Sequence, residues 1–213
     1  MRKLIVVPMV HLLEEVSWRV HRLFAESFTP SKNERMTESV LKSLVKMTRW
    51  LFEVALKKPE TLAKTHIFFD GLAQNFTDKQ IRNYLERGSD LGSVAATVTL
   101  HLVRIGAKIH GTEDPQLLKE YGHYQDVLVE RTRKARKLRS ATSPTVRDLI
   151  CSRLMLQLSL TTRDVAIAER IDSVVADGEI GLLFIGKDHK VGAFLKEMAP
   201  DFEIIYPNLR RIK

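Results

Sequence analysis

A single cysteine occurs among the 213 residues of the sequence. One cysteine excludes an internal disulfide framework and a zinc site built on cysteine ligands. Long apolar runs are lacking too, because no stretch approaches the roughly 18 to 20 apolar residues of a membrane-spanning helix. The apolar residues 4–7 follow Arg2 and Lys3 as in a secretory signal, but this run is short and Pro8 interrupts it. We therefore expect a cytoplasmic protein without a membrane span.

Internal repeats, low-complexity segments and a serine or cysteine nucleophile motif are also missing from the sequence. Cys151 lies in an apolar helical pattern, so we expect it in the core rather than in a catalytic site. The composition is 44% hydrophobic and 28% charged, with a mean hydropathy of -0.14, as in ordinary soluble domains. The length suits one domain over residues 1–213.

Basic residues exceed acidic ones by 34 to 26, which gives a net charge of +8. Such a balance favours polyanionic partners only weakly, and six basic residues gather within residues 131–139. Aromatic residues do not interleave with this run, and no nucleic-acid-binding motif surrounds it. Nucleic acid is therefore the least favoured partner. A solvated helix or a contact between two copies of the chain is the preferred interpretation.

Short apolar strands alternate with helical patterns along the chain. We predict strands at residues 4–7, 66–69, 107–110, 181–186 and 202–206, and helices at 14–28, 34–56, 77–87, 91–105, 115–175 (broken near 140–144) and 191–198. This alternation is typical of an α/β fold with a mainly parallel sheet, here of about five strands. Residues 116–160 break the alternation and are interpreted as a basic helical insertion. Its apolar stripe predicts a lid or a homodimer surface and comprises Leu149, Ile150, Leu154 and Leu158.

Ionisable residues follow four of the predicted strands, namely His11, Asp70, Glu113 and His189. Ligands of parallel sheets gather at the carboxyl ends of the strands, so these side chains are expected to converge there. Two imidazoles and two carboxylates suit a divalent metal such as zinc or manganese, with His11, Asp70 and His189 as ligands. They suit metal-free acid/base chemistry equally well.

The segment after the fourth predicted strand carries two further candidates, Gly186 and Asp188. The glycine lets the chain turn sharply and presents His189 at the sheet edge, and both residues are candidates for cofactor contacts. Simpler interpretations exist for the other positions. Asp70 with Gly71 is a common turn dipeptide, residues 113–115 suit a helix cap, and His11 suits a turn cap.

Arg163 shares a helical stripe with the apolar Ile167, Ile171 and Val174, so it is expected to face the sheet. The helical rise from Arg163 to the end of this segment is roughly 20 Å. The following strand spans roughly 17 to 20 Å. Arg163 is therefore expected beside His189, where it either binds a substrate anion or oxyanion or pairs with a carboxylate.

The order of these motifs resembles that of the TraB/PrgY, ChaN-like and erythromycin-esterase group of α/β proteins. Residues 163–171, from Arg163 and Asp164 to Ile171, are similar to the Arg-Asp-x-x-(Met/Ile)-Ala-x-x-Ile helix of that group. The segment from Gly186 to His189 resembles its final Gly-x-x-His. The first such motif ends at His11 but begins with proline, and the second strand ends in aspartate where relatives usually carry glutamate. The resemblance implies a site of His11, Asp70, Arg163 and His189.

Three hypotheses follow. The first is a hydrolase of the TraB/ChaN-like type, acting on a small-molecule or peptide substrate with an anionic or carbonyl group, through water activated by a histidine or a divalent metal. The second is a non-catalytic module of the same fold that binds a small molecule or, less favoured, haem through His11, His66 or His189. The third is association with nucleic acid through the basic helix.

Overall fold

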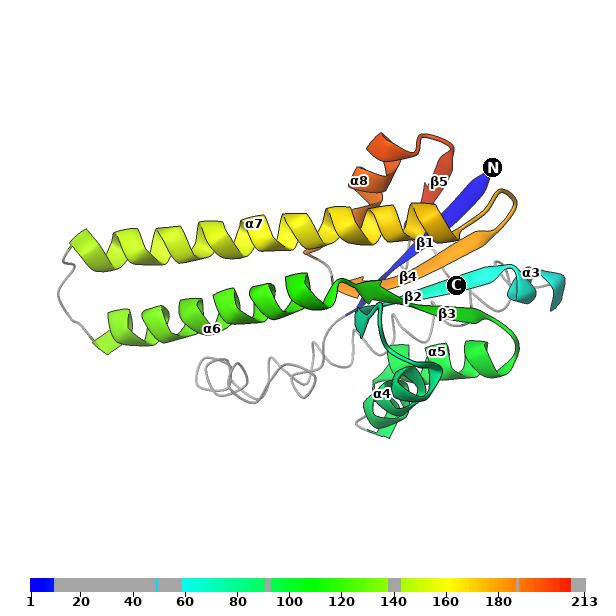
Figure 1. Ribbon diagram of the computed structural model, residues 1–213, viewed down its shortest axis with the longest axis horizontal. Coiled ribbons are helices and arrows are strands. Elements are labelled where there is room, and N and C mark those ends of the chain that lie inside the picture. The colour runs from blue at the N-terminus through cyan, green and yellow to red at the C-terminus, as the bar shows by residue number, and fades with distance from the viewer. Residues whose placement is uncertain (10–48, 50–58, 91–92, 138–142, 187, 208–213) are drawn as a thin grey trace.

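The computed structural model describes residues 1–9, 49, 59–90, 93–137, 143–186 and 188–207 (Figure 1). Its described elements in chain order are β1 (Arg2–Met9), α3 (Pro59–Ala63), β2 (Thr65–Ala73), α4 (Asp78–Asp90), α5 (Val94–Arg104), β3 (Lys108–Glu113), α6 (Pro115–Lys137), α7 (Ser143–Val174), β4 (Ile180–Gly186), α8 (Val191–Met198) and β5 (Phe202–Ile205). Five strands form one sheet in the order β3-β2-β4-β1-β5, and every pair is parallel. The predicted α/β fold with a parallel sheet of five strands is confirmed.

Both faces of the sheet are covered by helices, because its strands are apolar on both sides. Alternate strand residues point to opposite faces: Ile5 and Val7 pack with α4 and α5, whereas Leu4 and Val6 pack with α7 and α8. Phe69 and Phe184 belong to the first core and contact each other at a ring-centroid distance of 5.8 Å. Two buried layers therefore hold the strands between the helices.

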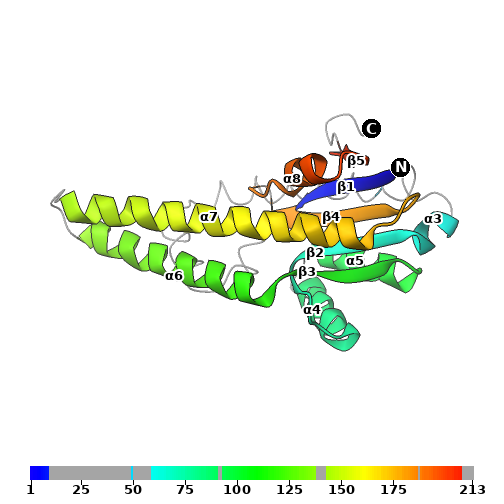
Figure 2. The ribbon, with the colours of Figure 1, turned by 45° about the horizontal axis from the view of Figure 1, so that its top comes forward.

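The helices α6 and α7 form a long pair that extends beyond the sheet (Figures 1 and 2). Arg131 of α6 joins them, since its guanidinium donates to the Ser152 hydroxyl at 2.8 Å and to the Asp148 carbonyl at 3.1 Å. The carboxyl half of α7 packs on the sheet through Ile167 and Ile171. The insertion predicted over residues 116–160 thus ends within a helix that continues without interruption onto the sheet.

Apolar side chains stay exposed on the outer half of α7. Ile150, Leu154 and Leu158 are spaced four residues apart, and more than half of each is accessible. The expectation that this stripe forms a lid or a dimer surface stays a prediction. Cys151 lies in the same part of the helix and is exposed, so its predicted place in the core is wrong. The reason is that this part of α7 extends past the sheet.

Two strands continue past the residues that were expected to end them. Gly71 has φ = +83°, which allows β2 to bulge and continue to Ala73 instead of turning. β3 likewise runs to Glu113, because the Thr112 hydroxyl donates to the Phe69 carbonyl at 2.7 Å and the Gln74 N–H donates to the Glu113 carbonyl at 2.8 Å. Asp70 and Glu113 therefore lie within the strands at the carboxyl rim, and not in the loops that follow them.

The helices end closer to their predicted positions than the strands do. α8 has the predicted bounds, and α5 stops where Gly106 adopts φ = +113°. Thr77 and Gln80 cap α4 reciprocally, since each side chain accepts from the backbone N–H of the other. Gly88 was expected to end α4, but the helix continues to Asp90. The helices predicted at residues 14–28 and 34–56 lie outside the described residues, apart from Arg49, which is helical.

Gly111 is expected to be indispensable to the carboxyl end of the sheet. A Cβ at this position would lie 2.2 Å from the backbone oxygen of Ala73, at the point where bulged β2 approaches β3. We predict that Gly111→Ala lowers the free energy of unfolding by about 3 kcal/mol, because backbone must shift to relieve the overlap. Urea denaturation measures this change.

Gly122→Ala is the matched control, since a Cβ on this α6 residue meets no atom within 4 Å apart from its chain neighbours and the backbone of its own helix. Alanine there is expected to stabilise the protein by about 0.5 to 1 kcal/mol through helix propensity. Equal effects of the two substitutions would contradict the close approach at Gly111.

Candidate functional site

The registers of the sheet bring the carboxyl ends of strands β3, β2, β4 and β1 level with one another. Phe69 pairs with both Gly111 and Phe184, and Met9 pairs with Gly186. Asp70 directly follows Phe69 on β2, Glu113 lies two residues after Gly111 on β3, and the chain after β4 carries His189. The predicted convergence at the carboxyl rim is therefore observed for these three side chains. His11 lies outside the described residues.

A buried arginine joins the two carboxylates. Arg163 of α7 binds Glu113 in a bidentate manner, with Nε 3.1 Å from Oε2 and Nη2 2.6 Å from Oε1. Its Nη2 also donates to Asp70 Oδ1 at 3.2 Å. All three side chains are at most 6% exposed. Of the two roles expected for Arg163, the geometry supports the pairing with carboxylates that ties α7 to the rim.

A second carboxylate on α7 holds the histidine. Asp164 Oδ1 contacts His189 Nδ1 at hydrogen-bonding distance, and Asp164 Oδ2 accepts from the Lys190 N–H at 2.7 Å. Bonding at Nδ1 places the proton there and leaves the Nε2 lone pair available. Nε2 lies 3.6 Å from Asp70 Oδ2, which is longer than a hydrogen bond.

Backbone N–H groups supply further hydrogen bonds to the two carboxylates. The Gly186 N–H donates to Asp70 Oδ2 at 3.3 Å, and the Gly71 N–H lies 3.5 Å from Glu113 Oε1. Asp114, the neighbour of Glu113, caps α6 by accepting from the Gln116 N–H at 2.7 Å. Glu113 therefore belongs to the buried cluster at the rim, and its neighbour Asp114 is the helix cap that the sequence also suggested.

Burial sets the electrostatics of the cluster. It raises the pKa of the Glu113 carboxyl, helped by the Asp70 charge and opposed by the hydrogen bonds from Arg163. Tyr121 of α6 lies over the guanidinium, with its ring centroid 4.4 Å from Arg163 Cζ, and burial raises the pKa of its phenol. The aromatic face therefore covers the arginine where the carboxylates do not.

The structure includes two residues that the sequence analysis did not select, Asp164 and Tyr121. Asp164 shares the sheet-facing side of α7 with Ala168 and Ile171, and these two side chains are buried. This spacing in the sequence was a usable signal for Asp164. Tyr121 had none, because its role depends on how α6 packs against α7.

The candidate cofactor contacts Gly186 and Asp188 have different environments. Gly186 acts through its backbone, as a donor to Asp70, whereas the Asp188 side chain is exposed. No group of three or more histidine, cysteine or acidic side chains within the described ranges has the geometry of a metal site. Asp70 and Glu113 share the Arg163 guanidinium, and the expected metal set stays a prediction, because its ligand His11 lies outside the described residues.

His66, an expected axial ligand for haem, belongs to a separate buried cluster near the amino end of β2. Its Nδ1 lies 2.9 Å from His110 Nε2 and its Nε2 lies 3.0 Å from Glu179 Oε2. The two imidazoles are stacked, with ring centroids 5.1 Å apart. Both nitrogens of His66 therefore face protein groups, which does not suit axial ligation of haem.

Comparison with known proteins gives no relative. No family model matches the chain, and no curated protein and no solved structure matches it significantly. No helix among the described residues is long and apolar enough to cross a membrane.

We predict that Arg163→Met strongly destabilises the protein, because it leaves two buried carboxylates without their cation. The expected loss in free energy of unfolding is about 3 to 5 kcal/mol, measured by chemical denaturation. Arg153→Met is the matched control, since Arg153 lies on the same helix and is exposed. A similar, small effect of both substitutions would show that the rim does not depend on this ion pair.

The histidine cluster predicts a pH-dependent stability. Burial, followed by repulsion from His66, lowers the pKa of His110 from 6.5 to about 4. The unfolded chain therefore takes up the proton first as the pH falls, and stability is lost between pH 6.5 and about 4. We expect a loss of about 1 kcal/mol, reduced by solvent because His110 is only half-buried.

His110→Gln removes this titration. Urea midpoints measured from pH 7 to pH 4.5 are expected to fall less steeply in the variant than in the wild-type protein. Parallel curves for the two proteins would contradict the assignment.

Proposed function

We propose that the protein is a hydrolase of the TraB/ChaN-like type, with His189 as the general base at the carboxyl rim. The observation that carries the proposal is the pairing of Asp164 with His189 Nδ1, which leaves Nε2 free to accept a proton. A base oriented by a carboxylate is the arrangement that general-base catalysis requires. The motif resemblance of residues 163–171 and 186–189 supports the same assignment.

The chemistry that suits this pair is hydrolysis of an acyl ester or amide. Water transfers a proton to His189 Nε2 while its oxygen forms a bond to the carbonyl carbon of the substrate. The resulting tetrahedral species expels the alcohol or amine, which takes the proton back from His189. Asp164 keeps the imidazole in the Nδ1–H tautomer, and the negative Asp70 favours the imidazolium formed in between.

Arg163 has an indirect part in this scheme. Its guanidinium is held by Glu113 and Asp70, so it positions Asp70 against His189 rather than binding the substrate. The substrate class is a small molecule or peptide whose carbonyl reaches Nε2. This assignment needs neither a serine nor a cysteine nucleophile.

A non-catalytic binding module of the same fold is the second candidate. It is favoured by burial, because the His189 side chain is only 7% exposed. Such burial also suits a purely structural role for His189, in which its contact with Asp164 holds the chain after β4 to α7. Association with nucleic acid has less support, since Arg131 is engaged with α7 and Lys134 pairs with Glu130 at 2.8 Å.

The test is hydrolysis of p-nitrophenyl acetate and butyrate by the full chain. We predict turnover by the wild-type protein and a decrease in kcat of about 10²- to 10⁴-fold in His189→Gln. Asp164→Asn is expected to lower kcat and to alter the pH profile, because the favoured tautomer is lost. His123→Gln, on the exposed side of α6, is the control and is expected to keep full activity.

Circular dichroism and the Tm of each variant separate a folding defect from a chemical one. No turnover by the wild-type protein, or equal turnover by folded His189→Gln, would argue against the hydrolase and for the binding module.

A further inference from the structure

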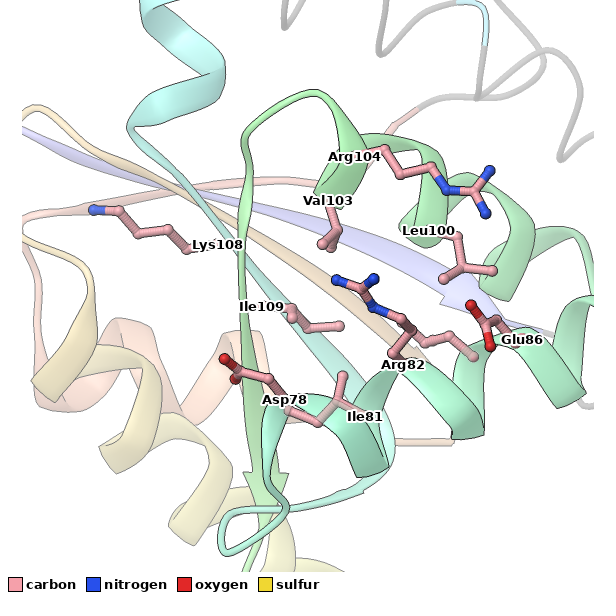
Figure 3. A pocket seen from close by; sticks show the side chains of 10 residues that line it. Asp78, Ile81, Arg82, Glu86, Leu100, Val103, Arg104, Lys108 and Ile109 are labelled. Carbon is pink, nitrogen blue, oxygen red and sulfur yellow. The ribbon is translucent and has the colours of Figure 1, made fainter.

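A groove lies at the outer edge of the sheet, between edge strand β3 and helices α4 and α5 (Figure 3). It has a volume of about 520 Å³, within the usual range of small-molecule sites of roughly 300 to 1,000 Å³. Its helices cover the sheet face opposite α7, and it shares no residue with the Arg163 cluster. A ligand here would be distinct from the substrate of the proposed hydrolase.

The floor of the groove is apolar. Ile81 and Leu85 of α4 are buried in the core, whereas partly exposed apolar side chains of α5 and β3 extend that core to the surface. These side chains are Leu100, Val103 and Ile109. An alkyl chain lying against them would remove the remaining apolar area from water, at roughly 25 cal/mol per Å².

Cations line the same groove. The Arg82 guanidinium points toward the apolar side chains Ile109, Val103 and Leu100 in the view of Figure 3, and Arg104 and Lys108 also contribute to the lining. Within the part of the chain that the structure describes, none of these three cations forms an ion pair. A guanidinium without a carboxylate partner, set among apolar side chains, suits a planar anion that binds it through two hydrogen bonds.

Two acidic residues limit the charge of that anion. Asp78 and Glu86 lie one turn before and one turn after Arg82 on α4, and they also line the groove. Three cations and two carboxylates leave a single net positive charge. A head group with one negative charge matches this balance, whereas a dianionic phosphate would be repelled by the neighbouring carboxylates.

We propose that this groove binds an amphipathic carboxylate, a fatty acid of medium chain length. Its carboxylate pairs with Arg82, and its alkyl chain lies on Leu100, Val103 and Ile109. The groove thus gives the protein a lipid-binding site that is separate from the carboxyl rim.

The test is calorimetric titration of the full chain with sodium dodecanoate below its micelle concentration. The wild-type protein is expected to bind one dodecanoate, and Arg82→Gln is expected to weaken binding by about 10- to 100-fold. Arg87→Gln is the matched control, because Arg87 is exposed on the same helix outside the groove. Dodecanol, with the same chain and no charge, is expected to bind at least about tenfold more weakly than dodecanoate.

Two further variants locate the alkyl chain. Val103→Trp fills the groove and is expected to abolish binding, whereas Leu154→Gln, on the exposed stripe of α7, is expected to leave it unchanged. The Tm of each free variant confirms that it is folded.

Failure of the wild-type protein to bind dodecanoate would overturn the proposal, as would equal binding by folded Arg82→Gln. Loss of binding in Leu154→Gln alone would assign the ligand to α7. Tighter binding of dodecyl phosphate than of dodecanoate would refute the singly charged head group. Ester hydrolysis by the wild-type protein is independent of all these outcomes.

Discussion

The ion pairs of Arg163 with Glu113 and Asp70 connect three elements that are far apart in the sequence. They join α7 to the carboxyl ends of β2 and β3, in a place where each charge alone would be expensive to bury. Because Asp70 also accepts from the Gly186 N–H, the same network reaches β4. The position of His189 depends on this arrangement, since its two neighbours, Asp70 and Asp164, belong to β2 and α7.

Much of this architecture follows from the sequence by elementary geometry. The apolar strands and the helices between them specify a parallel sheet, and such a sheet collects its polar residues at one rim. The level of Arg163 was obtained by matching the rise of a helix to that of a strand. Its buried pairing with rim carboxylates agrees with that match. Glu113 was found for the same reason, because it follows a predicted strand.

Other features depend on tertiary contacts that a single sequence does not display. Asp70 and Gly71 have the composition of a turn, yet Gly71 adopts a positive φ that keeps β2 in the sheet through a bulge. Tyr121 covers Arg163 only because α6 folds back on α7. The groove beside β3 combines residues of three elements, so no local sequence pattern predicts it. Cys151 was predicted in the core from its apolar helical pattern alone, and that pattern does not show that this part of α7 extends past the sheet.

The continuity of α7 has a mechanical consequence. This helix of 32 residues is about 48 Å long, and it carries the exposed apolar stripe near one end and both Arg163 and Asp164 farther along. A continuous helix transmits a tilt along its whole length instead of absorbing it in a loop. Displacement of its outer end would therefore move the arginine and the aspartate together, against strands that are fixed in the sheet.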